Sequence, residues 1–455
     1  MFERANYGRA KHEILIRQLM ELLSSVGKSD VDIQAFFSAK QYKQALLDLI
    51  TQAKRRIYIA ALYLQDDEAG REVLHALYKA KTENPYLEIK IFVDFHRAQR
   101  GLIGEKANLG NRSLYLKLAE EYAEVIDIYG VPVKSKEILG VLHLKGMVFD
   151  HSIFYTGASI NNIYLHQEEK YRLDRYHLIN SRPLSNSFCD YLDFTFVESE
   201  LCPLLNRGEI TNYNKTTVAQ LKALIKRSSY RLAQCKTQQN VTIKPVVACG
   251  ALRNDLNRSI RRLIQKSETS LLIFTPYFNL PKPLKKDIIK ALKRGVKITI
   301  VIGDKTANDF YIPEEKDFTT IGIVPYLYEM LLQRFVKRWQ KFVDSGLLTV
   351  RLWKHEVNSF HLKGIVSDER YHLLTGSNLN PRAWSLDLEN GLILDDVDKT
   401  LLPDLKKETD IIFANTEVLT HYDQLDTVAD YAVKPKKLIK KIRLTQIDRL
   451  LKRFL

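Results

Sequence analysis

The 455-residue chain has few cysteines and no long apolar run. Its four cysteines (Cys189, Cys202, Cys235 and Cys249) include no C-x-x-C pair, so they predict buried thiols and neither a disulfide framework nor a zinc site. No window approaches about 18 uncharged apolar residues, which argues against a membrane-spanning helix. The charged first residues contain no apolar segment of the secretory type. Together these absences predict a protein of the reducing cytoplasm.

Acidic residues are in the minority. The chain has 54 Asp and Glu against 69 Lys and Arg, a net charge of +15. Such a surplus indicates a polyanionic partner, either nucleic acid or the anionic face of a membrane, and composition does not choose between them. The apolar share of 45% is that of a globular protein. The length exceeds what a single core usually holds, so two domains are expected.

Two short stretches, 218 residues apart, have almost the same sequence. One contains His143 and Lys145, the other His361 and Lys363, and each follows the pattern H-x-K-x-x-x-x-D. Residues two apart in a strand point the same way, so each stretch sets an imidazole beside an ammonium group. Each leads into a turn of the Gly-x-x-x-Asn type, at 157–161 and 376–380. One copy alone would be an ordinary core histidine, but the matched pair indicates a function.

A regular order of helices and strands surrounds both stretches and predicts an α/β fold of two tandem halves. Loops that carry function are then expected beyond the carboxyl ends of the strands. Strands are expected at 57–64, 88–94, 125–129, 270–277, 297–304 and 348–353, and helices at 42–54, 72–81, 114–122, 256–265 and 284–293. We expect a helical N-terminal extension (1–40), a first half with a helical connection (41–240), a second half (241–400) and a helical basic tail (401–455). The segments 181–240, 321–344 and 434–455 are expected to lie outside the repeat.

If a pseudo-twofold axis brings both stretches to one cleft, the two histidines can divide the work on a phosphodiester. One neutral imidazole attacks phosphorus, and the other transfers a proton. The two lysines hold the non-bridging oxygens. Polar residues of the two turns are candidate neutral donors: Ser159, Asn161, Asn378 and Asn380. A cationic pocket of this kind would need no metal ion and no other cofactor.

Carboxylates that follow the two stretches are candidates to orient the imidazoles. Glu389 lies 28 residues after His361, and Asp174 lies 31 residues after His143. We expect each acid to hold the histidine of its own half, with Asp387 as an alternative for the second.

Other polar residues near the two stretches have weaker signals. Asp150 and Asp368 lie at an odd offset from their histidines, at the turn that ends each strand, and we interpret them as residues that fix a hairpin. Four loop residues are weaker candidates for substrate contact, equally compatible with a solvated loop: Arg97, Arg100, Lys305 and Asn308.

The duplicated motif with its turns resembles the signature of the phospholipase D superfamily. The resemblance covers roughly residues 41–400 and implies two α-β-α halves related by a pseudo-twofold, an active site at their interface and a phosphohistidine intermediate. Here the shared Asn comes one position later than in the commoner Gly-Ser-x-Asn turn. Several stretches resemble the bacterial phosphatidylserine synthases of the phospholipase D type, among them IAALYLQDDEAG (59–70), YLHQEEKYRLDRYHLI (164–179), GDKTANDFYIP (303–313) and NPRAWSLDLEN (380–390).

This resemblance implies transfer of a phosphatidyl group from CDP-diacylglycerol to L-serine, with release of CMP. His143 is then the nucleophile and His361 the acid/base, although the symmetry leaves the order open. The unrelated, metal-dependent class of these enzymes carries an Asp-Gly motif, and no Asp-Gly dipeptide occurs in the chain. Two alternatives remain: a phospholipase D or nuclease that uses water, and a non-catalytic binding protein. No specific nucleic acid is expected, because the positive charge is concentrated in the tail.

The tail after Pro435 predicts a helix with a basic face and an apolar face. Its region 434–455 holds nine Lys and Arg against one Asp. Such a helix can lie among the headgroups of an anionic membrane, which predicts a peripheral protein on the inner face of the cell membrane. The alternative is that the apolar stripe packs on the protein and the charges are merely solvated. If vesicle binding does not depend on the tail, the membrane contact passes to 321–344. The basic residues in question are Lys437, Lys440, Lys441, Arg449, Lys452 and Arg453.

Overall fold

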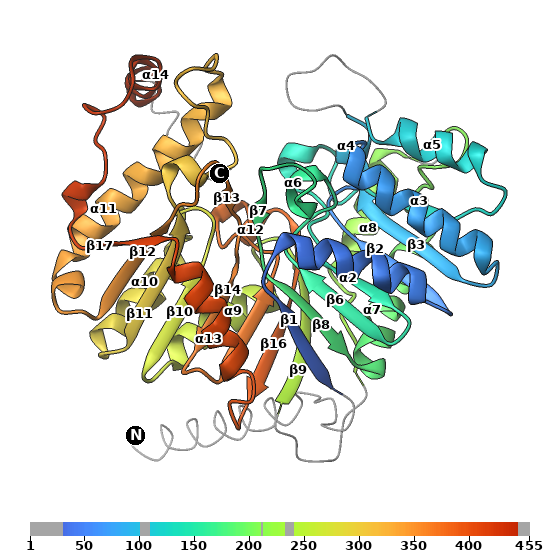
Figure 1. Ribbon diagram of the computed structural model, residues 1–455, viewed down its shortest axis with the longest axis horizontal. Helices are drawn as coiled ribbons and strands as arrows, with labels where there is room; N and C mark the ends of the chain where they lie inside the picture. The colour runs from blue at the N-terminus through green and yellow to red at the C-terminus, as the bar shows by residue number, and fades with distance from the viewer. Residues whose placement is uncertain (1–30, 101–109, 211–212, 233–240, 445–455) are drawn as a thin grey trace, which may run out of the picture.

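The computed structural model describes residues 31–100, 110–210, 213–232 and 241–444. Its two halves lie side by side, the first on the right of Figure 1 in blue to green and the second on the left in yellow to red. Each half is built around one β-sheet with helices packed against it. A mixed α/β fold of two tandem halves is therefore confirmed.

Seven strands form the sheet of the first half. They are β1 (Asp32–Phe36), β2 (Arg56–Ala60), β3 (Glu88–Asp94), β4 (Asp127–Val131), β5 (Gly146–Phe149), β6 (Ser152–Thr156) and β8 (Tyr176–Asn180). Their order across the sheet is β1-β8-β6-β5-β2-β3-β4. The helices of this half are α2 (Ala39–Gln52), α3 (Glu68–Glu83), α4 (Phe95–Ala98), α5 (Arg112–Glu121), α6 (Asn162–Leu165), α7 (Arg182–Leu192) and α8 (Lys215–Ile225), with the short turns η2 (Glu137–Leu139) and η3 (Asp193–Val197).

Eight strands form the sheet of the second half. They are β9 (Val241–Cys249), β10 (Ser270–Phe274), β11 (Lys297–Gly303), β12 (Leu348–Trp353), β14 (Gly364–Ser367), β15 (Tyr371–Thr375), β16 (Leu388–Asp396) and β17 (Thr416–Leu419). Their order is β17-β12-β11-β10-β14-β15-β16-β9. The helices are α9 (Asp255–Lys266), α10 (Lys282–Lys293), α11 (Val324–Asp344), α12 (Pro381–Ser385), α13 (Leu402–Phe413) and α14 (Val433–Leu444), with η4 (Lys305–Ala307), η5 (Thr320–Ile323) and η6 (Tyr422–Gln424).

Six strands of each sheet correspond one to one. The order β8-β6-β5-β2-β3-β4 in the first sheet is repeated as β16-β15-β14-β10-β11-β12 in the second. Strand directions match as well: β2 and β3 are parallel like β10 and β11, and β2 and β5 are antiparallel like β10 and β14. The repeat of the sequence is thus a repeat of structure, and the two His-Lys stretches occupy equivalent places before β5 and β14.

Two helices that we had placed outside the repeat belong to the cores of the halves. In α7, Leu184, Phe188 and Leu192 are buried at four-residue spacing. In α11, Phe335 and Val336 are buried against the second sheet, in the position between β11 and β12 that α5 has between β3 and β4. The basic residues that made α11 resemble an insertion lie on its exposed face. Helices that cover a sheet on one side are expected to be polar on the other.

The predicted boundaries also differ at both ends of the chain. Residues 32–36 form strand β1 beside β8, within the segment expected to be helical. Residues 402–419 form α13 and β17, and β17 pairs with β12 at the edge of the second sheet. The second half therefore extends past the predicted boundary at residue 400.

Helix α14 packs its apolar stripe on the protein. Ile439 is fully buried and Ile442 nearly so, in a cluster with Tyr326, Met330 and Tyr431. The apolar stripe of the described part of the tail therefore packs on the protein, and membrane contact through its basic residues stays a prediction. Lys437, Lys440 and Lys441 are exposed, whereas Arg449, Lys452 and Arg453 lie outside the described residues. No helix in the described part of the chain is long and apolar enough to cross a membrane.

Candidate active site

The two His-Lys stretches meet where the halves join, near α6, α12, β7 (Arg172–Leu173) and β13 (Ser359–Phe360) in Figure 1. Each stretch bonds through its backbone to the other half. The amide of His143 donates to the carbonyl of Leu388 at 2.9 Å, and the amide of His361 donates to the carbonyl of Leu173, also at 2.9 Å. The second contact extends the parallel pairing of β7 with β13. Both histidines are therefore positioned by the interface and not by one half alone.

A glycine follows each lysine at the start of the next strand. Gly146 and Gly364 have φ values of +120° and +146°, which a residue with a side chain rarely adopts. The turn lets the chain pass from the interface segment into β5 or β14. The His-Lys-Gly pattern thus joins the site to the strand that carries it.

Each imidazole is held by a carboxylate of the opposite half, which corrects our expectation. Both oxygens of Glu389 lie near Nδ1 of His143, at 2.9 and 3.0 Å. Oδ2 of Asp174 lies 2.9 Å from Nδ1 of His361. Asp387 holds neither ring, because it accepts from the Val141 amide and pairs with Arg382. The partners exchange because the segments before β8 and at the start of β16 cross to pair with the opposite His-Lys stretch.

Both imidazoles are buried and therefore resist protonation. Burial lowers the pKa of His143 well below its usual value, and the nearby Lys145 and Lys363 lower it further. Burial and Lys363 lower the pKa of His361 to about 4. Both rings are therefore neutral near pH 7, the state in which imidazole acts as a nucleophile or a base.

The two carboxylates differ in their charge state. Burial acts to raise the pKa of Asp174, but Lys363 and His361 outweigh it and the pKa falls to about 2. Burial raises the pKa of Glu389 well above its usual value, and Asp387 adds to the effect. Asp174 is therefore firmly ionised, and Glu389 sits in an environment that disfavours an isolated negative charge.

The two lysines are buried cations that face a shared region. The Lys145 ammonium donates to Oγ of Ser159 at 3.2 Å, and the Lys363 ammonium lies 3.0 Å from Asp174 and also contacts His361. Burial and the charge of Lys363 lower the pKa of Lys145 to about 7. An anion bound between the two ammonium groups would offset both the burial of their charges and the repulsion between them. The region is therefore suited to a phosphate group.

The asparagines of the two turns act first as helix caps. The side-chain oxygen of Asn161 accepts from the Tyr164 amide at 3.0 Å, and that of Asn380 accepts from the Ala383 amide at 2.9 Å. The amide NH₂ group of Asn161 donates to the Tyr63 hydroxyl at 3.3 Å. Asn378 differs, because its Oδ1 is shielded from solvent and has no hydrogen-bond partner among the described residues.

Asp150 and Asp368 hold backbone at the far end of their strands. Asp150 accepts from the amides of Lys54, Arg55 and Arg56. Asp368 accepts from the amides of residues 268–270 in the equivalent way. Both have positive φ values, 52° and 55°, at the turn of the hairpin. Their oxygens bind the loop that leads into the central strand and are directed away from the histidines.

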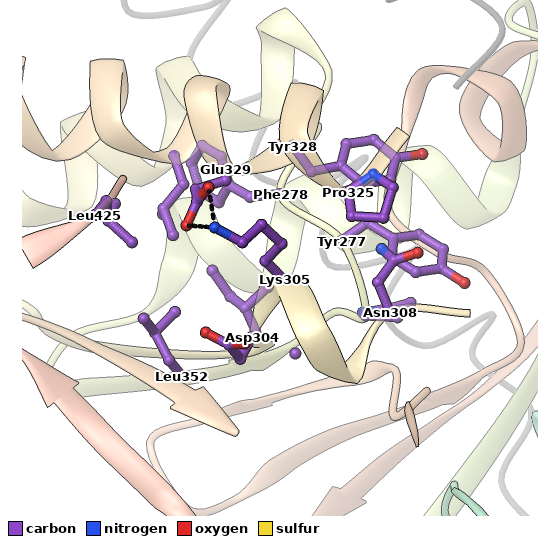
Figure 2. A pocket seen from close by; sticks show the side chains of 14 residues that line it. Tyr277, Phe278, Asp304, Lys305, Asn308, Pro325, Tyr328, Glu329, Leu352 and Leu425 are labelled. Atoms are coloured by element: carbon purple, nitrogen blue, oxygen red, sulfur yellow. Dashed lines mark hydrogen bonds and ion pairs between the residues drawn. The ribbon is translucent and has the colours of Figure 1, made fainter. Parts of the chain in front are cut away.

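The weaker loop candidates have mixed outcomes. Lys305 is paired with Glu329 and Asp426, and Figure 2 shows its ammonium bonded to both carboxylate oxygens of Glu329. Both residues line a cavity of about 20 Å³, which Asn308 and Tyr277 also line. Such a volume holds about one water molecule. Lys305 is therefore a structural cation.

The other loop candidates lie in the first half or cap a local turn. Arg100 is paired with Glu137, and the Asn308 side chain accepts from the Phe310 amide. The Arg97 guanidinium lies over the Tyr63 ring at 4.8 Å. No carboxylate of a described residue is within ion-pair distance of Arg97.

The comparisons with known proteins agree with this geometry. A family model described as "Cardiolipin synthase, PLD-like domain" matches residues 46–168 and 260–423. The CDP-diacylglycerol–serine O-phosphatidyltransferase of Escherichia coli is 41% identical over 99% of this chain and 100% of its own length. The chain belongs to the PLD-like family that this model describes. The same-named Haemophilus influenzae protein is 42% identical over 93% of this chain and 94% of its own. The crystal structure of the H. influenzae phosphatidylserine synthase covers 96% of this chain and 99% of its own, with a TM-score of 0.90 at 39% identity.

Some residues near the two histidines had no signal in the sequence that we could interpret. The Tyr164 hydroxyl lies 2.9 Å from Nδ1 of His361. Asn390 exchanges two hydrogen bonds with the backbone of Lys145 across the interface. Arg172 and Asp309 form an ion pair of 2.8 Å close to His361. Each of these residues is close to an expected site residue in the chain or in space, but none is duplicated in the other half.

Proposed function

We propose that this protein transfers the phosphatidyl group of CDP-diacylglycerol to L-serine, giving phosphatidylserine and CMP. The observation that carries the proposal is the pair of neutral histidines, each with a carboxylate at Nδ1, beside two buried lysines at one interface. Similarity along nearly the full chain to proteins named for this reaction supports the choice of substrates.

In the first step, His143 attacks the phosphorus of the phosphatidyl group. A P–N bond forms, and the bond from phosphorus to the CMP oxygen breaks. Glu389 at Nδ1 leaves Nε2 as the nitrogen available for attack. CMP departs as a phosphate monoester, whose second pKa is about 6, so it needs little protonation. Lys145 and Lys363 stabilise the negative charge on the non-bridging oxygens, with Ser159 and the turn asparagines as neutral donors.

In the second step, the serine hydroxyl attacks the phosphatidyl-histidine. The P–N bond breaks, a P–O bond forms, and the hydroxyl proton passes to His361, which later releases it to solvent. The lowered pKa of His361 supports its role as a base, because the ring is already neutral. Ionised Asp174 stabilises the imidazolium that results. The surroundings of the two histidines differ, since a tyrosine hydroxyl and an ion pair lie on the His361 side only.

A hydrolase of the same fold would use the same residues with water as acceptor. Labelled CDP-diacylglycerol, supplied with and without serine, separates these functions. We expect labelled phosphatidylserine that requires serine, with little phosphatidic acid. Phosphatidic acid formed at the same rate in both conditions would establish a hydrolase, and no turnover in either would contradict both.

We further propose that the protein is cytoplasmic and binds the inner face of the cell membrane peripherally. The net charge of +15 and the exposed lysines of α14 support electrostatic attraction to anionic lipid. Exposed apolar side chains occur at both ends of the same helix, at Val433 and Leu444. The buried stripe of α14 takes no part in this contact, because Ile439 and Ile442 are used by the core.

A further inference from the structure

An ion pair beside His361 has no role in the chemistry described above. Nε of Arg172 and Oδ1 of Asp309 are 2.8 Å apart, and the Tyr277 hydroxyl donates to Oδ2 of Asp309 at 2.6 Å. The two charged side chains retain 14% and 11% of their exposure. The two groups are thus largely shielded from bulk water, and their remaining exposure lies on atoms other than the two that are paired.

Backbone geometry directs Arg172 to the same side as the residue that holds His361. Arg172 lies two positions before Asp174, so the two side chains point the same way along this extended segment. The Arg172 guanidinium lies 4.7 Å above the Tyr164 ring, whose hydroxyl is 2.9 Å from Nδ1 of His361. The Tyr277 ring is 6.4 Å from the His361 ring. The Tyr164 side chain thus connects the Arg172 guanidinium to His361, the proposed base.

The pairing of the two charges is incomplete. The Nε of Arg172 and the Oδ1 of Asp309 are within ion-pair distance, yet they are not aligned for a hydrogen bond with each other or with any other described group. A guanidinium has five N–H donors and is strongest when it binds a carboxylate with two of them. A partly buried ion pair without such bonds contributes little to stability. The pair is thus more easily explained by a ligand than by folding.

The pair also breaks the symmetry of the two halves. Asp174 and Glu389 occupy equivalent places, so the equivalent of Arg172 is Asp387, which is engaged with Arg382 and the Val141 amide. A reaction in which one histidine meets the donor and the other meets the acceptor requires a difference of this kind. The cation–anion pair lies on the side of the base.

We propose that Arg172 and Asp309 bind the α-carboxylate and the α-ammonium of L-serine and present its hydroxyl to His361. The inference rests on the proposed function and identifies its acceptor site. The serine carboxylate takes the place of Asp309 as the partner of Arg172, and the serine ammonium takes the place of Arg172 as the partner of Asp309. The zwitterion therefore binds without a change in the net charge of the site. The Arg172 fork then binds the carboxylate, and Asp309 accepts from the ammonium.

Two variants test the assignment separately for each group of serine. Arg172→Gln and Asp309→Asn should each raise the KM for serine about 100-fold, the effect of losing hydrogen bonds between charged groups. Exchange of labelled CMP into CDP-diacylglycerol uses only the first step and needs no serine. We expect this exchange to stay near the wild-type rate in both variants. Arg261→Gln, which removes the partner of buried Asp287 between α9 and α10, is the matched control and should change neither quantity.

Acceptor selectivity supplies a readout that a purely structural role would not move. Arg172→Gln should reduce the preference for serine over ethanolamine, which lacks the carboxylate. Asp309→Asn should reduce the preference for serine over 3-hydroxypropionate, which lacks the ammonium group.

Three outcomes are decisive against the account. An unchanged KM for serine in both variants overturns the inference. Loss of CMP exchange together with transfer also overturns it, because the pair would then serve the common machinery or the fold. Wild-type protein that shows neither CMP exchange nor serine-dependent product contradicts the proposed function itself, and the inference with it.

Discussion

Glu389, near the start of strand β16 in the second half, holds His143 of the first half through both carboxylate oxygens, at 2.9 and 3.0 Å from Nδ1. Asp174 of the first half holds His361 of the second at 2.9 Å. Each half thus lacks the acid that its own histidine needs. The exchange makes the interface a requirement for chemistry and not only for stability.

Glu389→Gln should abolish the first step as well as the whole reaction. The amide cannot stabilise the positive charge on the imidazole or favour the tautomer that leaves Nε2 free, and loss of such a carboxylate lowers kcat by roughly 10⁴-fold in a catalytic triad. Both CMP exchange and phosphatidylserine formation are measured, with circular dichroism to check folding. Asp395→Asn on the same strand removes a surface ion pair with Arg370 and serves as the control. Full CMP exchange in Glu389→Gln would show that His143 is held by another group or is not the nucleophile.

The pH dependence of kcat/KM for CDP-diacylglycerol should report the free site. Lys145, with a pKa of about 7, carries its charge below that pH and loses it above. The ratio should therefore fall as the pH rises through about 7, because a neutral amine no longer attracts the diphosphate. His143 stays neutral to well below pH 6.5, so its protonation gives no acid limb centred near pH 6.5. An acid limb centred near pH 6.5, or a flat profile from pH 7 to 9, would contradict this assignment.

Turnover should be unaffected by a chelator. The proposed charge stabilisation comes from Lys145 and Lys363, with neutral donors from the turns, and requires no divalent ion. Activity is compared before and after dialysis against EDTA, at constant ionic strength so that membrane binding does not change. Activity lost with EDTA and restored by one divalent metal would replace this account of the first step.

Helix α14 should contribute to membrane binding through its exposed lysines and to stability through its buried isoleucines. Replacement of Lys437, Lys440 and Lys441 by Glu should weaken co-sedimentation with anionic vesicles, and most strongly at low salt. Ile439→Ala should leave that binding nearly intact and lower the free energy of unfolding by about 2–4 kcal/mol. Salt-insensitive binding that is lost in Ile439→Ala, without loss of stability, would instead show that the stripe inserts into the membrane.

Much of the fold and part of the site could be predicted from the sequence. The duplicated His-Lys stretches and the repeated strand pattern predict two halves, because period and spacing are local properties of the chain. The identities of Asp174 and Glu389 as candidate acids were also accessible. Their pairing was not, since each lies about 30 residues after a histidine and nothing in that spacing tells which histidine is near in space.

Other errors had a common physical origin. A helix with one apolar face has the same pattern whether that face meets a membrane or a protein, so the sequence alone does not reveal that the stripe of α14 packs on the protein or that α11 covers the second sheet. A charged loop residue such as Lys305 has the same identity whether it binds a substrate or a neighbouring carboxylate. Arg172 and Asp309 had no repeated counterpart, so an interpretation based on duplication passed over them.

The central claim is that His143 carries the phosphatidyl group between the two steps. The most direct measurement is mass spectrometry of the wild-type protein, quenched at high pH after mixing with CDP-diacylglycerol in the absence of serine. The account predicts a phosphatidyl adduct on the peptide that contains His143, which disappears when serine is added before the quench. An adduct on His361 would reverse the roles of the two histidines, and protein that turns over without an adduct on either would contradict covalent catalysis.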